Sequence, residues 1–558
     1  MSDSTCVGDA CRWARQTPDR VWLTQPMGGA EMRTLTWRQA LDEARRMAAH
    51  LESRGLPARS HIAIFSKNCA WWILADLAIW MAGHVSVPLY PNLTARTIRQ
   101  ILDSSDSRLV FVGKLDDFEK MQPGIPPELP RIRLPLAPAS PGACWDELIA
   151  QHAPQARPVT RSPEELATLI HTSGTTGAPK GVMLSFGAMR AATEGIVKLL
   201  GLQAHDRMLS YLPLAHAFER GVVEQVGLAV GFPIFFSESL DTFLRDLKCA
   251  RPTLFVSVPR LWQKFQQGVL AKMPETRLRL LLTIPIVKQA VRRRVLASLG
   301  LDAVRLAASG SAPLPATLLH WYLRLGLELI EGYGMSETFN YGHVTRVGQV
   351  RDGSVGPAME GVECRVSPEG EVLLKSPGMM MGYYRLPEET AAVFTPEGFF
   401  KTGDRGELDA RGHLRLAGRI GELFKTSKGK YVAPAPIEGN LLAHPEVEQA
   451  YVGGLGCPQP FGLVSLSDDG RRAVAAGAGR RALHASLGRH LARVNDTLDR
   501  HEQMAFLAVI TDVWDVDSGF LTPTLKIRRR ALDAFYGPRV PAWYDAGESV
   551  IWPDGAAA

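Results

Sequence analysis

Residues 172–181 read Thr172-Ser173-Gly174-Thr175-Thr176-Gly177-Ala178-Pro179-Lys180-Gly181, the strongest local signal in the chain. The apolar runs 166–170 and 181–184 predict a strand on each side of this loop. Three glycines allow backbone NH groups to turn inward around an anion, four hydroxyl groups add donors, and the lysine adds a positive charge. The loop therefore predicts a cradle for a polyphosphate.

Two alternatives apply to this loop. A Walker A loop would need the pair Gly-Lys to begin five residues after Gly174, but Pro179 stands there, so that pattern is excluded. A hairpin turn rich in glycine and threonine, without a ligand, is the plainer alternative. The number of constrained positions in ten residues favours the phosphate interpretation.

The loop resembles the signature of the acyl-adenylate-forming superfamily of acyl-CoA synthetases, luciferases and peptide-synthetase adenylation domains. Four further motifs follow in that family's order, so the resemblance extends from about Trp37 to Leu532. It implies an α/β fold with a large N-terminal adenylation domain, made of layered α/β subdomains and a β-rich subdomain, and a small mobile α+β C-terminal domain. The expected boundaries are 1–418 for the AMP-binding domain, 419–422 for the hinge and 423–558 for the C-terminal domain.

Further motifs concern the nucleotide. Residues 331–338, Glu331-Gly332-Tyr333-Gly334-Met335-Ser336-Glu337-Thr338, resemble the family's adenine and metal motif, with Tyr333 stacked on the base and Glu337 on Mg²⁺. A carboxylate suits Mg²⁺, which is usually held by one or two carboxylates and phosphates. A hydrolase nucleophile elbow is excluded, because it needs glycine where Thr338 stands. The resemblance also assigns these residues to the nucleotide: Gly310, Ser311 and Ala312 beside the adenine, and Asp404 and Arg419 at the ribose.

The acid and the catalytic lysine have motifs of their own. Residues 212–220 (LPLAHAFER) and 258–265 resemble segments of the long-chain members, which places His216 near the substrate carboxylate; a purely structural histidine is the equal alternative. The family's catalytic lysine corresponds to Lys526. Two like unit charges about 4 Å apart repel by about 4 kcal/mol at an effective dielectric near 20, so a cation between carboxylate and α-phosphate offsets a large repulsion.

The remaining site expectations concern the second half-reaction. Gly421 stands at the hinge, where relatives often carry Asp or Lys, and Lys428, Gly429 and Lys430 belong to a loop similar to the one lining the family's pantetheine path. The expected co-substrates are ATP, a fatty acid and coenzyme A, with Mg²⁺ as activator. Two other functions stay open: a fatty acyl-AMP ligase that passes its acyl group to a carrier protein, and a catalytically silent nucleotide-binding protein.

Composition limits the remaining classes. With 558 residues, 46% hydrophobic and 22% charged, the chain predicts a globular protein with more than one core. Seven scattered cysteines without ligand spacing predict neither disulfides nor a zinc site, and favour the cytoplasm. The formal charge of +6 and the short basic runs 292–294 and 528–530 do not indicate a nucleic-acid partner. A solvated face is the favoured interpretation of 292–294, and attraction to anionic lipid or to the phosphates of CoA stays open for both runs.

Local patterns predict individual elements. The apolar stretch 71–90 is interrupted by Asp76, Gly83 and His84 and contains Pro88, so we expect a buried helix running into a strand and not a membrane span. Other expectations are strands at 61–65, 108–112 and 254–258, helices at 94–103, 186–200 and 480–500, and a surface loop at 471–481. Closely spaced strands are expected from about 353 to 418.

Overall fold

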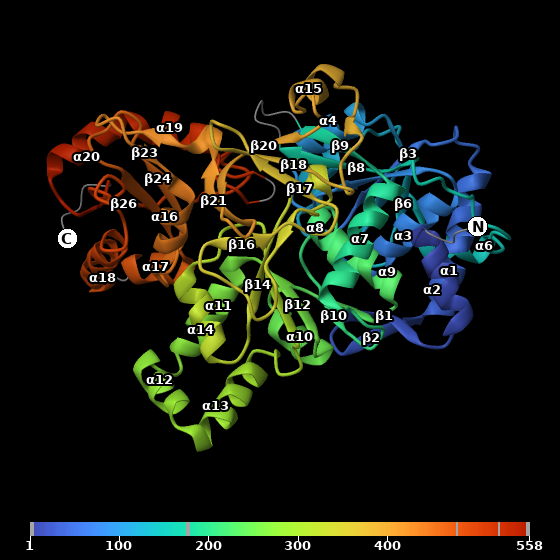
Figure 1. Cartoon of the computed structure of the whole chain (residues 1–558). Coiled ribbons are helices and arrows are strands. Elements are labelled where there is room, and N and C mark those ends of the chain that lie inside the picture. The colour runs from blue at the N-terminus through green and yellow to red at the C-terminus, as the bar shows by residue number, and fades with distance from the viewer. Residues whose placement is uncertain (1–4, 174–178, 476–477, 523–524, 554–558) are drawn as a thin grey trace.

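The computed structural model describes residues 5–173, 179–475, 478–522 and 525–553. Figure 1 shows sheets covered by helices in several layers, with the C-terminal part of the chain on one side of the molecule. The predicted mixed α/β class is confirmed. The proposed boundaries at 418 and 423 stay a prediction.

The largest sheet has eight strands. Their order is β19 (Gly382–Tyr383), β9 (Pro179–Ser185), β8 (Leu166–Ser173), β4 (Val85–Leu89), β3 (His61–Phe65), β5 (Ser107–Val112), β6 (Arg131–Arg133) and β7 (Ala143–Cys144). The six strands from β8 to β7 are parallel, whereas β9 and β19 are added antiparallel at one edge. The helices of this part are α1 (Cys6–Gln16), α2 (Trp37–Ser53), α3 (Ala70–Met81), α4 (Ala95–Ser104), α5 (Phe118–Met121), α6 (Trp145–Gln151) and α7 (Phe186–Leu200).

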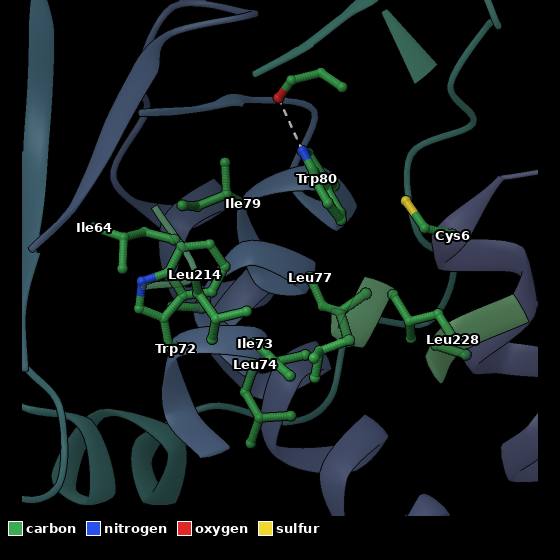
Figure 2. Packing of buried hydrophobic residues seen from close by; sticks show 14 of the residues in the cluster. Cys6, Ile64, Trp72, Ile73, Leu74, Leu77, Ile79, Trp80, Leu214 and Leu228 are labelled. Atoms are coloured by element: carbon green, nitrogen blue, oxygen red, sulfur yellow. Dashed lines mark hydrogen bonds between the residues drawn. The ribbon is translucent and has the colours of Figure 1, made fainter. Parts of the chain in front are cut away.

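Helix α3 forms the centre of the main hydrophobic core. All twelve of its residues are buried, and the chain continues into β4, so the predicted buried helix and strand are confirmed. Figure 2 shows Trp72 and Trp80 of this helix among aliphatic side chains, with the indole of Trp80 donating a hydrogen bond of 2.9 Å to the carbonyl of Ala167. Across the described ranges, no helix combines the length and hydropathy needed to cross a bilayer.

The chain also forms two four-stranded sheets. One contains β10 (Met208–Ser210), β11 (Ile234–Phe236), β1 (Val21–Gly28) and β2 (Glu31–Thr36), and the other β12 (Leu254–Ser257), β13 (Leu306–Ser309), β14 (Leu329–Tyr333) and β15 (His343–Val344). Their helices are α8 (Ala217–Glu219), the π-helical turn η2 (Arg220–Gln225), α9 (Val226–Val230), α10 (Phe243–Ala250), α11 (Pro259–Leu270), α12 (Glu275–Thr283), α13 (Pro285–Ser298) and α14 (Ala316–Arg324). Strands β12, β13 and β14 are parallel, so the residues that follow them meet at one edge.

The closely spaced strands expected after residue 353 form a five-stranded sheet. Its order is β16 (Ser354–Pro357), β21 (His413–Arg419), β20 (Phe400–Leu408), β18 (Glu371–Lys375) and β17 (Glu363–Val366), and α15 (Pro387–Ala392) lies between β19 and β20 in the chain. The sheet is antiparallel throughout and joins strands that are near in sequence. It carries Asp404 and Arg419 on neighbouring strands.

The last part of the chain has its own mixed sheet. Its strands are β24 (Val447–Gly453), β25 (Phe461–Leu466), β26 (Leu507–Ile510) and β27 (Val550–Ile551), preceded by the hairpin of β22 (Phe424–Lys425) and β23 (Tyr431–Val432). The helices are α16 (Pro434–Leu441), α17 (Asp468–Ala475), α18 (Ala478–Asn495), α19 (Arg529–Tyr536) and α20 (Val540–Ala546). Two hydrophobic clusters, one on each side of this sheet's residues, give the part its own core.

One prediction in this part was wrong, and the bounds of another differ. The expected surface loop at 471–481 is helical on both sides of the undescribed residues 476–477, because arginine and alanine favour helix and Arg471 and Arg472 pair with the acids three residues before them. The helix expected at 480–500 begins at Ala478 and ends at Asn495, whose side-chain amide donates to the carbonyl of Met504 over 2.9 Å.

Candidate active site

The edge formed by β12, β13 and β14 brings two predicted nucleotide segments together. Ser257, Ser309 and Glu331 are aligned across the three parallel strands, so residues 310–312 and Tyr333 lie beyond the same edge. The backbone NH of Gly310 donates to the carbonyl of Ser257 over 3.1 Å, which fixes the start of that segment. The sheet itself therefore positions both segments.

Gly310 is also where the acid segment meets the adenine motif. A Cβ atom placed on Gly310 would lie 3.2 Å from the ring of Phe218 and 3.5 Å from the carbonyl oxygen of Gly332. The next residue, Ser311, has a left-handed backbone with φ of 68°, an unfavourable conformation for a residue with a side chain. Phe218, Gly310 and Gly332 thus form one packed junction between the predicted acid and adenine segments.

The adenine motif folds tightly back on itself. A Cβ atom on Gly334 would approach the backbone of Asn340 to 2.5 Å, so only glycine fits there. The Glu331 carboxylate lies behind this turn: one oxygen accepts from the NH of Leu314 over 3.2 Å, and the other is buried with no hydrogen-bond partner among the described residues. Burial raises the pKa of Glu331 to about 7. An unpartnered acceptor of this kind fits an amino group such as that of adenine.

The predicted ribose residues lie directly beside Tyr333. Asp404 and Arg419 face each other across β20 and β21, and the Arg419 Nε lies 2.9 Å from one Asp404 oxygen. The hydroxyl of Tyr333 donates to the other oxygen over 2.7 Å. Burial raises the pKa of Asp404, and the Arg419 charge opposes that shift. The structure therefore brings Tyr333, Asp404 and Arg419 together, as the sequence predicts.

The phosphate loop connects two paired strands. Thr172 on β8 pairs with Lys180 on β9, and the backbone of Ser173 pairs with Pro179. Gly174, Thr175, Thr176 and Gly177, which carry most of the predicted cradle, lie outside the described residues. Their proposed role therefore stays a prediction.

Lys180 and Glu337 are linked through a residue that the sequence analysis missed. The ammonium of Lys180 lies over the ring of Tyr383, 5.4 Å from its centroid, and the Tyr383 hydroxyl donates to Glu337 over 2.9 Å. The same ammonium lies 2.5 Å from a carboxylate oxygen of Glu389 on α15. A Gly-Tyr-Tyr-Arg sequence at 382–385 was the available signal: an aromatic pair between a glycine and a cation.

His216 caps the short helix α8. Its Nδ1 accepts from the backbone NH of Phe218 over 3.0 Å, and its ring lies edge-on to Tyr90, with centroids 6.3 Å apart. Burial and, to a smaller extent, the charge of Lys526 lower the pKa of His216 to about 4. The imidazole is therefore neutral near pH 7, and because Nδ1 accepts, its proton is on Nε2.

Lys526 approaches the same group of residues from the C-terminal part of the chain. Its backbone NH donates to the hydroxyl of Thr522 over 3.1 Å, and the residue before it, Leu525, has a left-handed φ of 60°. Lys526 keeps solvent access, yet the surrounding protein lowers its pKa by limiting hydration, and the Arg419 charge lowers it further. Glu337 and Asp404 act in the opposite direction. Lys526 therefore lies close enough to interact electrostatically with the predicted ribose residue Asp404, the predicted metal ligand Glu337 and the acid-site residue His216.

Two arginines make the ion pairs that hold the C-terminal part in this orientation. Arg260 on α11 pairs with Glu448 on β24. Arg529, three residues after Lys526, lies 2.6 Å from Glu438 and 3.3 Å from Glu422, which belongs to the turn η4 (Ile420–Glu422). The Arg529–Glu422 pair connects the segment that carries Lys526 directly to the predicted hinge.

The hinge and the coenzyme loop are open to solvent. Gly421 lies in η4, and a Cβ atom there would meet no atom within 4 Å. Lys428, Gly429 and Lys430 form the exposed turn between β22 and β23. The roles assigned to these residues stay predictions.

A buried carboxyl that the sequence analysis missed supports the acid segment. One oxygen of Glu219 accepts from the hydroxyl of Ser210 over 3.0 Å and from the NH of Tyr211 over 2.9 Å. The side-chain amide of Asn68 accepts from the NH of Leu214 and donates to Ser210, so both ends of the segment before His216 are held. Burial raises the pKa of Glu219 from 4.5 to about 8.

We expect Glu219→Gln to weaken the pH dependence of stability. The folded state binds a proton at Glu219 that the unfolded state releases between about pH 4.5 and about pH 8, so the free energy of unfolding of the parent falls as pH rises through this window, by on the order of 1 kcal/mol per pH unit. Glutamine keeps the accepting oxygen and removes the titration. Thermal melting across this window tests it, with the exposed Glu407→Gln as control; parallel curves for parent and Glu219→Gln would contradict it.

Residues 11–384 match the family model described as AMP-binding enzyme. The chain belongs to this family. Among curated AMP-binding relatives, long-chain-fatty-acid–CoA ligase FadD15 of Mycobacterium bovis is 30% identical over 95% of both chains. Long-chain-fatty-acid–CoA ligase 1 of Homo sapiens is 29% identical over 87% of this chain and 78% of the relative.

Solved structures of AMP-binding enzymes share the fold. The adenylation domain of a carboxylate reductase from Mycobacterium chelonae has a TM-score of 0.82 and 22% identity, over 97% of this chain and 91% of that chain. The anthranilate CoA ligase AuaEII, solved with anthranoyl-AMP, has a TM-score of 0.77 and 22% identity, over 96% and 98%. The match extends through the C-terminal part of this AMP-binding enzyme, so the fold of nearly the whole chain is that of an adenylation enzyme.

Proposed function

We propose that the protein is an ATP-dependent fatty acid:CoA ligase that forms an acyl-adenylate and then a thioester, releasing pyrophosphate and AMP. One observation carries the proposal: Tyr333 and Arg419 both contact Asp404, over 2.7 and 2.9 Å, which joins the predicted adenine and ribose residues in one site beside Lys526. The names of the long-chain relatives support a fatty acid as the substrate.

In the first step, the carboxylate attacks the α-phosphorus of ATP and pyrophosphate leaves. Lys526 stabilises the negative charge that develops between the two anions, and Lys180 exchanges Glu389 for a phosphate oxygen. His216 donates a hydrogen bond from Nε2 to the substrate carboxylate. Because the imidazole is neutral, the carboxylate stays ionised and forms no ion pair with it. Glu331 accepts from the adenine amino group, and Asp404 from the ribose hydroxyls.

The residues present fit a magnesium ion held with the nucleotide. Glu337 supplies a hard carboxylate oxygen near Lys180 and Tyr383, and phosphate oxygens and water would complete the coordination that Mg²⁺ prefers. When bound, the ion would neutralise phosphate charge.

In the second step, the C-terminal part rotates about Gly421, withdraws Lys526 and brings the turn 428–430 toward the adenylate. The thiol of CoA then attacks the acyl carbon, and AMP leaves as the thioester forms. The exposed turn with two lysines suits the phosphates of CoA. Rotation requires the Arg260–Glu448 pair to separate.

We place the reaction in the cytoplasm, with a peripheral contact to a membrane. No disulfide joins any of the seven cysteines, all of which lie among the described residues, and a reducing compartment keeps cysteines in the thiol form. A fatty acid substrate partitions into bilayers, which favours an enzyme that works at their surface.

We expect purified protein to release AMP with acids of about eight or more carbons in preference to shorter ones, because each buried CH₂ contributes about 0.8 kcal/mol. The measurement is kcat/KM across a series of acids of graded length with ATP and free CoA, together with detection of acyl-CoA. A preference for acetate or an aromatic acid would contradict the fatty substrate. Adenylate without acyl-CoA would favour a carrier-protein acceptor, and absent ATP/pyrophosphate exchange would favour a silent protein.

A further inference from the structure

The positive charge of the chain is concentrated on one projecting helical hairpin. Helices α12 and α13 form this hairpin, which extends away from the body of the molecule in Figure 1. Residues 271–300 contain seven basic residues and one acidic residue, a net charge of +6 that equals the formal charge of the entire chain. The other 528 residues are balanced, so the hairpin is a local cationic surface.

The hairpin has one apolar face in the core and a second one in solvent. Leu278, Leu282 and Val295 are buried and pack in the cluster that contains α10 and α14. By contrast, Ile286 is 92% exposed and Leu280 is 64% exposed. The core contacts account for the buried face of the hairpin. They do not account for the exposed apolar residues, which are typical of an interaction surface.

The exposed residues follow the same order along both helices. On α13, Ile286 near the turn is followed by Arg293 two turns later, on the same face; on α12, Arg277 lies within the helix, and Ile284 follows the helix end at Thr283, in the extended link to α13. Seven residues of helix span about 10 Å, so on α13 the arginine stands about 10 Å behind the isoleucine near the tip. Amphipathic segments insert apolar side chains about 5–10 Å into the headgroup and acyl boundary, with basic residues among the headgroups.

The charges of the hairpin are available to a partner. Its one acid, Glu275, lies 3.4 Å from Arg324, and Arg292 donates to the carbonyl of Arg324 over 2.9 Å, which secures the base of the hairpin. Arg293 and Arg294 are exposed on the outer side. Each basic residue near an anionic membrane surface adds attraction that extends about one Debye length.

We propose that the α12–α13 hairpin docks the protein on an anionic lipid bilayer, with the tip isoleucines inserted and the arginines on the headgroups. The apolar tip distinguishes this partner from nucleic acid. Residues 271–300 contain no aromatic side chain on which a base could stack, and their most exposed large hydrophobic residue is an isoleucine.

Co-sedimentation with vesicles tests the docking, without ATP or any acid, so its outcome is independent of the proposed reaction. The parent should bind vesicles of phosphatidylcholine and phosphatidylglycerol, bind pure phosphatidylcholine weakly, and dissociate at high salt. Arg293→Glu/Arg294→Glu should lower the partition coefficient at least about tenfold, since each basic residue near the surface contributes about fivefold in affinity and two are reversed. Ile284→Glu/Ile286→Glu should lower it by a similar factor.

Matched variants serve as controls. Met32 on β2 is 41% exposed, as is Ile284, and Met32→Glu should leave binding unchanged. Arg54→Glu/Arg157→Glu removes the same charge from exposed positions near α2 and α6, far from the hairpin in Figure 1, and should have a much smaller effect. Equal binding of parent and both hairpin variants would overturn the proposal, as would a parent that binds single-stranded RNA through these arginines and ignores vesicles.

Discussion

Lys526→Ala is expected to suppress acyl-adenylate formation at least a hundredfold, a loss of about 3 kcal/mol of transition-state stabilisation. The physical reason is the position of its ammonium. Asp404 and Glu337 raise the pKa of Lys526, and the charge of Lys526 lowers the pKa of His216, so the ammonium lies near all three residues. Without this cation, the carboxylate and the α-phosphate meet with their repulsion uncompensated. ATP/pyrophosphate exchange with the preferred acid measures the effect.

Two comparisons make the Lys526 result specific. ATP affinity should change little, because Tyr333, Asp404 and Glu331 are outside the C-terminal part. Arg530→Ala removes an exposed cation four residues further along and should retain most of the exchange activity. If Lys526→Ala formed adenylate at nearly the parent rate, another group would have to perform its role.

Gly421→Pro is expected to separate the two half-reactions. Proline fixes φ near −65° and disfavours the α region at Ile420, so the turn η4 loses the freedom that a rotation requires. We expect thioester formation from preformed acyl-adenylate to fall at least about a hundredfold, and exchange to fall less than about tenfold, or about 1.4 kcal/mol. Exchange should fall less than thioester formation, because the orientation in this structure already places Lys526 near Asp404 and Glu337.

The matched control is Gly421→Ala. A Cβ atom there meets nothing within 4 Å, and its φ lies outside the left-handed range, so alanine should be tolerated in this orientation. Both half-reactions are measured on one folded preparation, with thermal melting to detect general damage. Equal losses in the two assays would contradict a hinge role for Gly421.

The sequence predicted those parts of the site that are contiguous. Glu331 to Thr338 fold as one tight turn, so a short motif contains the whole local geometry. Asp404 and Arg419 were also predictable, because an antiparallel pair places them opposite each other at short separation. In both cases the partner of each residue is nearby in the chain.

Contacts between distant segments could not be predicted from the sequence. Tyr383 reaches Lys180 because β19 pairs with β9, about 200 residues earlier. Arg220 was visible in the LPLAHAFER segment, but its buried partner Asp76, 144 residues earlier on α3, depends on how that helix packs against the π-helical turn η2. Such pairs are decided by tertiary packing, which leaves no local pattern.

The Arg260–Glu448 pair would resist the proposed rotation of the C-terminal part. It joins α11 to β24 in the orientation that brings Lys526 near Asp404 and Glu337, so it would have to separate before that part could leave. Both side chains are about one-third exposed, so the pair should weaken as the salt concentration rises. In the proposed cycle, high salt would therefore favour early departure of Lys526 and, while CoA is absent, earlier access of water to the adenylate.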